Sequence, residues 1–379
     1  MERVSRCRVC GGLFFSQPLL QLHNMPNAAQ FMPDASTLSQ DVGTDLRVCH
    51  CSACGLIQLD TLPVAYYREV VRAAAYSPEM GDYRLAQFTG FAKRFGLIGQ
   101  KVLEVGCGRG EYLTLLNQSG MEAHGLEYGA ESVSHCQSIQ QRVCQGFIET
   151  ADHQLASAPF QAFFILNFLE HLPQPHETLR GVANNLSEGA VGLVEVPNFD
   201  MILRNRLFSE FINDHLFYFN RESLSQLLAL SGFEVVECTE TWHDYILSAT
   251  VRKRAPADLS ALVDFQAKID REIHHYLDTL KGQRVAIWGA GHQALAVISL
   301  LGLQSRVDYV VDSAPFKQGK FTPASHLPIV PPAHLKTDPV DGVLVMAASY
   351  SDEVARIIRS QYDPKLSVAI LRDSGLEIV

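Results

Sequence analysis

The sequence lacks the features that mark membrane-spanning and secreted chains. No stretch of 18 consecutive apolar residues occurs, and the N-terminus has no hydrophobic signal segment. Neither a membrane span nor secretion is therefore predicted, and we expect a cytoplasmic protein. Low-complexity segments and internal repeats are also absent.

Positive charge is sparse. The net charge is -10, and the longest run of basic residues is Arg252-Lys253-Arg254. Because binding to phosphates needs a concentrated basic surface, nucleic acid is not expected as a partner. Hydrophobic residues make up 47% of the 379 residues and charged residues 19%. These proportions are typical of a globular protein, and the length predicts two or three domains.

Four of the nine cysteines form two matched pairs. Cys7 and Cys10 stand in one Cys-x-x-Cys-Gly sequence, and Cys51 and Cys54 stand in another. In a reducing compartment, cysteines occur as thiols or metal ligands rather than as disulfides. Two such pairs brought together by a hairpin would form a closed, structural site for Zn²⁺ with four thiolates. Cys49 competes with Cys51 but lacks the two-residue spacing to Cys54.

The zinc site would organise the N-terminal part of the chain. We expect residues 1–75 to form a small zinc-binding domain, in which the metal replaces a core that so short a segment can hardly supply. The alternative is that the four cysteines are reduced thiols in a protein core.

A strand, a glycine-rich turn and a helix are predicted at residues 101–113. The strand carries Glu104, and the turn contains Gly106, Gly108 and Gly110. Such a turn lets a ligand lie against bare backbone at the N-terminus of a helix. The alternative is a tight turn with a purely structural role.

A second strand, at residues 122–126, is followed directly by Glu127. At this place a carboxylate can accept hydrogen bonds from two ribose hydroxyls, so a nucleoside cofactor is predicted. The E-x-G-x-G-x-G pattern that begins at Glu104 resembles the first motif of class I S-adenosylmethionine-dependent methyltransferases.

The alternation of segments from residue 80 to 250 predicts an α/β fold with a doubly wound sheet. Asn167 and His171 follow one of its strands, at the end of the sheet where side chains reach the methyl donor. The expected strands are residues 101–105, 122–126, 162–166, 191–196, 233–238 and 245–252.

The last third of the chain predicts another domain. Residues 256–281 have the apolar period of one long amphipathic helix. Gly289, Gly291 and Ala294 then form a G-x-G-x-x-A turn, and Asp312 ends the next strand. This spacing is that of a dinucleotide fingerprint, so a second Rossmann-like domain is expected. Further strands are predicted at residues 342–347 and 366–371.

The order of these parts resembles the sugar C-methyltransferases that act on nucleotide-linked keto-deoxysugars. The resemblance covers nearly the whole chain, and its most specific phrases lie at residues 25–31, 54–59, 310–312, 317–320 and 327–329. It implies a zinc-binding domain at residues 1–75, an S-adenosylmethionine-dependent methyltransferase domain at 76–255, and a linker helix with a Rossmann-like substrate domain at 256–379.

The resemblance also implies a reaction. In that family a base removes the proton beside the ketone of the sugar, and the enolate carbon attacks the methyl group of S-adenosylmethionine. The matching motif here is Ile212-Asn213-Asp214-His215, which makes His215 the candidate base. Asp214 would bind a sugar hydroxyl or position the base. The family usually has tyrosine and glutamate at the places of Ile212 and Asp214.

Two more side chains are implied for the same cleft. By resemblance, His171 is a catalytic or enolate-binding residue, and Tyr76 is an active-site tyrosine, with Tyr66 and Tyr67 as competitors. Histidine is suited to such proton removal because its pKa lies near neutrality.

Three other functions fit parts of the sequence. The same cofactor would serve methylation of oxygen or nitrogen in a sugar or small metabolite. Gly289, Gly291, Ala294 and Asp312 would suit an NAD-binding oxidoreductase. Finally, the N-terminal domain would be a partner-binding module in a protein without catalysis.

Overall fold

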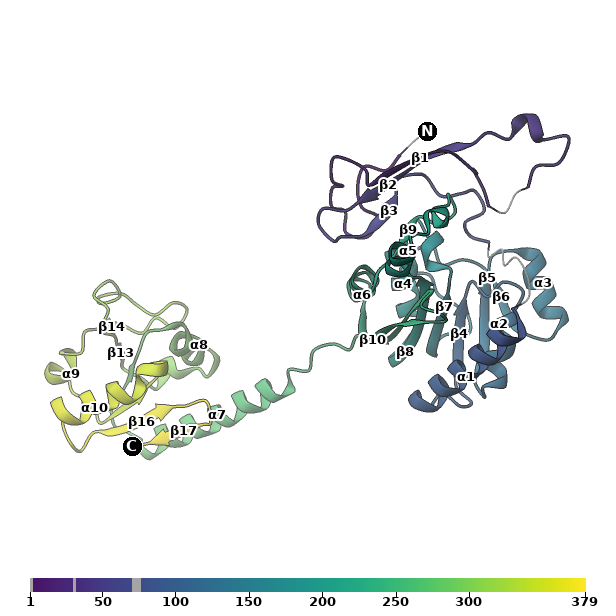
Figure 1. Cartoon of the computed structure of the whole chain (residues 1–379). Helices are drawn as coiled ribbons and strands as arrows, with labels where there is room; N and C mark the ends of the chain where they lie inside the picture. Colours follow the sequence, from purple (N-terminus) through teal and green to yellow (C-terminus); the bar gives the residue numbers. More distant parts are fainter. Residues whose placement is uncertain (1–2, 30–31, 70–75) are drawn as a thin grey trace. The chain divides into compact units, whose positions relative to one another are not determined.

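The computed structural model describes residues 3–29, 32–69 and 76–379, and the chain forms two compact units, Met1–Pro256 and Ala257–Val379 (Figure 1). Residues 30–31 of the phrase at 25–31, and the expected domain boundary at residue 75, lie outside the described residues. In the described part, no helix is long and apolar enough to cross a membrane. The division of the first unit into a zinc-binding and a methyltransferase domain stays a prediction.

The first unit contains a seven-stranded sheet with the strand order β10-β11-β8-β7-β4-β5-β6. Only β11 runs antiparallel to its neighbours. This is a doubly wound, mostly parallel α/β sheet, as predicted. The strands are β4 (Lys101–Val105), β5 (Glu122–Glu127), β6 (Arg142–Gln145), β7 (Phe160–Leu166), β8 (Leu186–Pro197), β10 (Phe233–Thr241) and β11 (Ile246–Lys253).

Every expected strand of this sheet is present, whereas β6 was not predicted. The sequence of β6, Arg-Val-Cys-Gln, is short and mostly exposed, because β6 lies at the edge of the sheet. It therefore shows neither a long apolar run nor a clear alternation.

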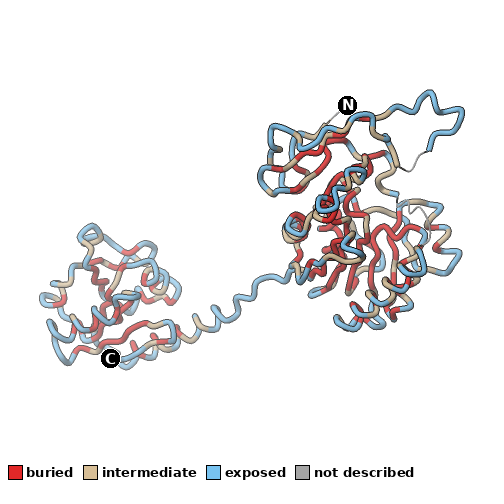
Figure 2. The backbone as a smooth tube through the Cα atoms, in the orientation of Figure 1, coloured by how far each residue is buried: buried red, intermediate tan, exposed pale blue. Residues whose placement is uncertain are grey.

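Alternate residues of the central strands face two different hydrophobic cores, which places the sheet between two layers of helices. Val102 and Phe164 pack with helices α1 (Pro78–Phe95) and α2 (Glu111–Gln118). Leu103 and Phe163 pack with α4 (Pro175–Asn184) and α6 (Arg221–Leu230) on the other face. Figure 2 shows the buried chain concentrated along these strands. The remaining helices of this unit are α3 (Ala130–Ser138) and α5 (Phe199–Asn205).

The N-terminal segment forms a separate four-stranded sheet with the order β1-β2-β3-β9. Its first three strands are β1 (Leu20–Met25), β2 (Thr44–His50) and β3 (Ile57–Leu59). The fourth, β9 (Phe217–Tyr218), comes from a later part of the first unit, after β8 in the chain, and pairs with β3. This pairing ties the N-terminal sheet to a strand that begins two residues after His215.

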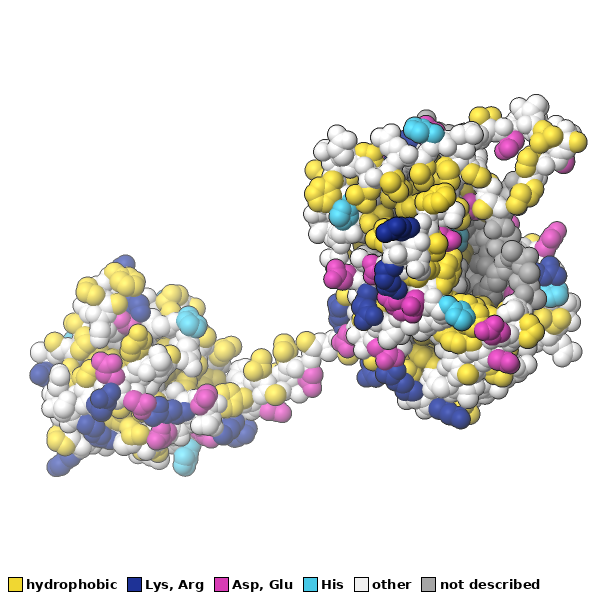
Figure 3. Space-filling model, viewed as in Figure 1, with side chains coloured by type: hydrophobic (Ala, Val, Ile, Leu, Met, Phe, Trp, Pro, Cys, Tyr) yellow, Lys and Arg dark blue, Asp and Glu magenta, His cyan; other side chains and the backbone are white. Residues whose placement is uncertain are grey.

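The second unit contains a six-stranded sheet with the order β14-β13-β12-β15-β16-β17, in which only β17 is antiparallel. The predicted long helix is α7 (Ser260–Thr279), whose C-terminal half packs on this sheet through Ile269, Ile273 and Leu277. The other elements are β12 (Val285–Trp288), β13 (Tyr309–Val311), β14 (Ile329–Val330), β15 (Gly342–Val345), β16 (Ser367–Leu371), β17 (Leu376–Ile378), α8 (His292–Leu300), α9 (His334–Thr337) and α10 (Ser351–Gln361). On the face shown in Figure 3, acidic and basic side chains are interspersed on each unit.

Candidate active site and metal centre

The structure brings the four predicted metal ligands together. The sulfur atoms of Cys7, Cys10, Cys51 and Cys54 all lie within 4.8 Å of one another. The closest pairs are Cys7 and Cys54 at 3.6 Å, and Cys10 and Cys51 at 3.4 Å. Four thiolates at about 2.3 Å from one Zn²⁺ ion have nearly this separation, so the donor set fits zinc. The cluster is confirmed, and zinc as its occupant stays a prediction.

Backbone amides point at the sulfur atoms of this cluster. The amide of Val9 lies 3.4 Å from Cys7 Sγ, and the amide of Gly12 lies 3.3 Å from Cys10 Sγ. A Cβ atom on Gly12 would lie only 2.8 Å from Cβ of Ala53, so a side chain here would push the two pairs apart. Donors of this kind stabilise the negative charge of metal-bound thiolates. Among the described residues, Cys49 is not part of the cluster.

The predicted cofactor residues meet where β4 and β5 end. Gly106, Gly108 and Gly110 have φ angles of 72°, 56° and 85°, which L-residues with side chains rarely adopt. A Cβ atom on Gly106 would lie 2.6 Å from the Phe168 ring. The turn leads directly into α2, so its backbone is open to a ligand at the start of that helix.

Glu127 and Asn167 lie beside this turn. The Glu127 carboxylate accepts hydrogen bonds of 2.8 Å from the amides of Gly108 and Gly129, which fixes its orientation. Asn167 follows β7 with a φ of 51°, and its buried Oδ1 accepts no hydrogen bond from the described residues. Glu104 is fully buried just before the turn. The site thus offers a fixed carboxylate, an amide oxygen that accepts no hydrogen bond from the described residues, and a turn of glycines without side chains. This combination fits S-adenosylmethionine, whose ribose and amino groups donate hydrogen bonds.

His171 and His215 lie together next to this site. Their ring centroids are 4.8 Å apart, and the rings meet edge to face at 72°. Nδ1 of His171 donates to the backbone carbonyl of Asp214 at 2.9 Å. Because a carbonyl only accepts, Nδ1 carries the proton of the neutral ring, and Nε2 keeps a lone pair. His171 also lies near Phe168, with ring centroids 6.4 Å apart, which links the pair to the glycine turn.

The surroundings keep this group of side chains neutral at pH 7. Burial lowers the pKa of His171, and burial together with the nearby His171 lowers the pKa of His215 to about 3. Burial raises the pKa of Glu170 to about 8. Desolvation explains both directions, because it disfavours the charged form of each group. The His171 side chain is still 25% exposed, so the site remains accessible.

Glu170 is a functional candidate that the sequence analysis did not single out. Its Oε1 lies 3.9 Å from Nε2 of His171, and its Oε2 is buried without a hydrogen-bond partner in the described part of the chain. The ligand atoms of Glu170, His171 and His215 lie within 4.8 Å of one another. Two imidazoles and a carboxylate suit a divalent cation, and they equally suit proton transfer.

The Asp214 carboxylate contacts the N-terminal segment rather than His215. It accepts hydrogen bonds from the Tyr66 hydroxyl at 2.5 Å and from the Ala29 amide at 2.9 Å. Tyr66, which sequence reasoning placed behind Tyr76, is therefore the tyrosine that reaches the predicted motif. Tyr76 instead stacks on Tyr112 at the start of α2, with ring centroids 5.9 Å apart. The structure thus places Tyr76 near the cofactor turn.

In the second unit, the carboxylate of Asp312, the acid of the dinucleotide-like fingerprint, already binds other groups of the protein. Asp312 accepts hydrogen bonds from the amides of Ala290 and Ala314 and forms a 2.9 Å ion pair with Lys317. Lys317 also donates to the Ala290 carbonyl at 3.0 Å. Ala290 and Lys317 both bind Oδ2 of Asp312, which leaves this oxygen less available to ribose hydroxyls and disfavours the oxidoreductase alternative.

Two family models match the chain. Residues 65–238 match a model described as a methyltransferase domain, and residues 249–364 match one described as a C-methyltransferase C-terminal domain. The chain is 24% identical to the protein named C-methyltransferase NovU of Streptomyces niveus, over 93% of this chain and 91% of that protein. It is also 31% identical to the ubiquinone biosynthesis O-methyltransferase of Proteus mirabilis (strain HI4320), over 25% of this chain and 40% of that protein.

Solved structures resemble part of the chain. An S-adenosylmethionine-dependent methyltransferase from Clostridium acetobutylicum ATCC 824 aligns with 46% of this chain and 92% of its own length. The TM-score is 0.39 and the sequence identity is 11%.

We predict that the purified protein contains one zinc per chain and that Cys54→Ser removes it, because three thiolates no longer close a tetrahedral site. Elemental analysis of the freshly purified protein measures this. Cys49→Ser is the matched control and should keep its zinc. A wild-type protein without metal, or full zinc in Cys54→Ser, would contradict the assignment.

We predict that Glu127→Ala weakens binding of S-adenosylmethionine, since the variant loses an acceptor for ribose hydroxyls. Hydrogen bonds to a charged group contribute about 1.5–3 kcal/mol each, so the dissociation constant should rise at least tenfold. Calorimetry measures the affinity. Asp312→Ala, the matching acid of the second unit, should bind with wild-type affinity. Unchanged affinity in Glu127→Ala would remove Glu127 from the cofactor site.

We predict that Glu170→Gln makes stability less dependent on pH. The pKa of Glu170 is raised from 4.5 to about 8 on folding, so its contribution to stability is fully present below pH 4.5 and is lost as the pH rises through 8. Wild-type protein should lose on the order of 3 kcal/mol from this group between pH 5 and 8. Denaturant unfolding at several pH values measures this, and equal pH slopes for the two proteins would exclude a raised pKa.

Proposed function

We propose, on the premise that this chain is an S-adenosylmethionine-dependent C-methyltransferase, that it methylates the carbon beside the ketone of a nucleotide-linked keto-sugar. The methyl transfer follows removal of the proton from that carbon. The observation that supports this reaction best is the neutral pair of His171 and His215 beside the cofactor turn.

Proton removal from such a carbon needs a base in its neutral form and a way to stabilise the enolate. We assign the base to His215 because it belongs to the predicted motif and its ring lies against that of His171 beside the glycine turn. Burial lowers the pKa of His215 to about 3, below the near-neutral value expected from the sequence, so proton removal by this ring depends on stabilisation of the enolate that forms. After it takes the proton, His215 is an imidazolium next to the negative enolate, and the two charges stabilise each other. The partial burial of the site strengthens this attraction.

Neighbouring residues support this step. The Asp214 carbonyl fixes the tautomer of His171, so Nε2 of His171 is a second proton acceptor in contact with His215. We assign Asp214 a positioning role, because Tyr66 and Ala29 already bind its carboxylate. Tyr76 belongs to the cofactor end of the site in this scheme.

When bound, S-adenosylmethionine supplies an electrophilic methyl group. The residues assigned to hold it are Glu104, Gly106, Gly108, Gly110, Glu127 and Asn167. They lie at the carboxyl ends of β4, β5 and β7, where doubly wound sheets bind ligands. Because Phe168 contacts the glycine turn and lies near His171, the methyl donor and the base would share one cleft.

We predict that His215→Ala lowers turnover by about 10²–10⁴ and leaves the affinity for S-adenosylmethionine nearly unchanged, as expected for a general base. The direct assay is loss of a deuterium label from the carbon beside the ketone. Exchange reports proton removal even without methyl transfer. A variant that exchanges the label at the wild-type rate would assign the base elsewhere, with His171 and Tyr76 as the next candidates.

The acceptor itself is tested with a panel of uridine- and thymidine-diphosphate-linked 4-keto-6-deoxyhexoses, with mass spectrometry of the products. A new methyl group on carbon together with loss of the α-deuterium supports the proposal. Methylation with full retention of the label would instead identify an oxygen or nitrogen acceptor.

A further inference from the structure

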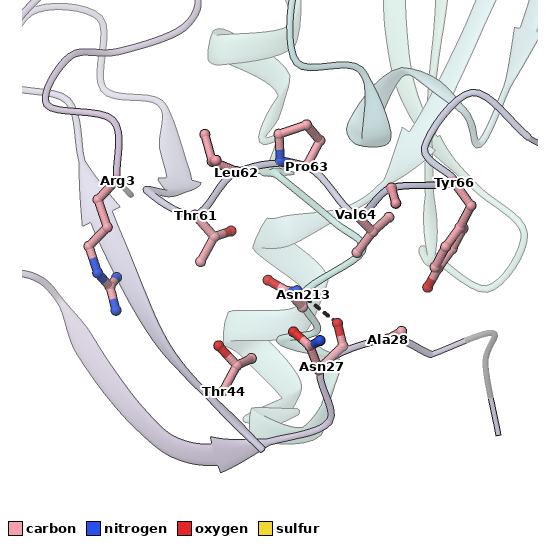
Figure 4. Close-up of a pocket in the computed structure, with 11 residues that line it drawn as sticks. Arg3, Asn27, Ala28, Thr44, Thr61, Leu62, Pro63, Val64, Tyr66 and Asn213 are labelled. Atoms are coloured by element: carbon pink, nitrogen blue, oxygen red, sulfur yellow. Dashed lines mark hydrogen bonds between the residues drawn. The ribbon is translucent and has the colours of Figure 1, made fainter. Parts of the chain in front are cut away.

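A cavity of 460 Å³ in the first unit takes no part in the mechanism described above (Figure 4). Its wall consists of Arg3, Thr44, Asn213 and the segments 27–28 and 61–66. It therefore lies between the N-terminal segment and the motif that contains Asp214 and His215. The volume lies within the usual range for small-molecule sites.

Asn213 presents a fixed hydrogen-bond acceptor at this cavity. Its Nδ2 donates to the backbone carbonyl of Asn27 at 2.8 Å, as the dashed line in Figure 4 shows. Because a carbonyl only accepts, this bond settles which end of the Asn213 amide is nitrogen. The other end, Oδ1, is buried and has no hydrogen-bond partner in the part of the chain that the structure describes.

Thr61 adds a second polar group of the same kind. Its hydroxyl oxygen is buried, and within the described ranges it makes no hydrogen bond. In Figure 4 the side chains of Thr61 and Asn213 point into the same hollow. Folded proteins leave few buried polar atoms unpaired. Two of them on one cavity wall indicate a ligand that carries hydroxyl groups.

The rest of the wall specifies the kind of ligand further. Leu62, Pro63 and Val64 offer apolar surface. Arg3 forms an ion pair with the buried Asp60, whose carboxylate also pairs with Arg47. Apolar surface together with hydrogen-bonding groups matches a ring that has C–H groups on one side and hydroxyls at its edge.

The cavity is also connected to the proposed base. Tyr66 lies in the cavity wall and donates to the carboxylate of Asp214, whose carbonyl binds His171. Asn213 precedes Asp214 directly in the chain. A molecule that fills the cavity therefore contacts the segment that positions the two histidines.

We propose that this cavity binds a hydroxylated ring of the methyl acceptor, away from the carbon that receives the methyl group, and that Thr61 and Asn213 determine which acceptor is used. The assignment rests on the proposed function. Thr61→Val is the best test, because it removes the hydroxyl and keeps the shape of the side chain. Thr178→Val, a buried threonine on α4 whose hydroxyl binds the Ile148 carbonyl, is the matched control.

The experiment measures binding of a uridine-diphosphate-linked 4-keto-6-deoxyhexose by calorimetry in the presence of S-adenosylhomocysteine. Thr61→Val should weaken binding about tenfold, the usual effect of losing one hydrogen bond, with unchanged affinity for S-adenosylhomocysteine. In steady state, KM for the sugar should rise and kcat should stay nearly constant. Acceptor analogues that each lack one hydroxyl complete a double-mutant cycle, and for one of them the difference between Thr61→Val and wild type should disappear.

The outcomes separate the two proposals. If wild-type protein methylates the sugar but Thr61→Val binds it as tightly as wild type, the cavity is filled with water only, and this inference fails alone. Equal weakening by Thr178→Val would show a general loss of structure and would also overturn it. If wild-type protein neither binds nor methylates the sugar, the proposed function fails, and the cavity assignment fails with it.

Discussion

The candidate active site depends on the contacts of one residue, Asp214. Its carboxylate binds Tyr66 and Ala29 from the N-terminal segment, and its carbonyl binds His171 from the end of β7. A single residue thus connects the segment that carries the cysteine cluster, the methyltransferase sheet and the proposed base. Because these are hydrogen bonds with strict directions, a shift of the N-terminal segment changes the orientation of the histidines. Catalytic geometry tolerates little displacement of this kind.

Burial gives this site its chemical character. Desolvation raises the pKa of Glu170 to about 8, so a carboxyl group that is ionised in water at pH 7 is neutral here, and it lowers the pKa of both histidines, which resists their protonation. A charged intermediate formed in such a place interacts strongly with its neighbours, because little water screens it. Keeping Glu170 protonated at pH 7 costs folding stability, and perturbed pKa values of this kind are common at functional sites.

Much of the architecture could be predicted from the sequence because the signals were local. The glycine turn, Glu127 and the strands of the central sheet each follow from residue spacing along a short segment. The long helix α7 was visible in its apolar period. The paired cysteine motifs likewise identified the four-cysteine cluster, since two matching spacings restrict the geometry strongly.

The features that could not be predicted from the sequence depend on contacts between distant parts of the chain. Tyr66 reaches Asp214 across 148 positions, and no local pattern distinguishes it from Tyr67 or Tyr76. Glu170 looks like an ordinary charged residue, and only its burial makes it a candidate. Similarly, the acid of the second fingerprint has the right spacing, but Lys317 binds it in the folded structure. The spacing of residues predicts where a side chain lies. It does not predict which neighbouring groups already bind that side chain in the folded structure.

The strand β9 limits which segments of this protein can be exchanged with those of a relative. Phe217 pairs with Gln58, and the Gln58 side chain donates to the sulfur of Cys7 at 3.1 Å. The N-terminal sheet therefore contains residues that come after strands β4 to β8 of the seven-stranded sheet in the chain. A hybrid protein that takes residues 1–75 from a relative must also take residues 212–218 from the same source. Without that segment the exchanged sheet has no matching edge strand, and the two histidines lose their supporting loop.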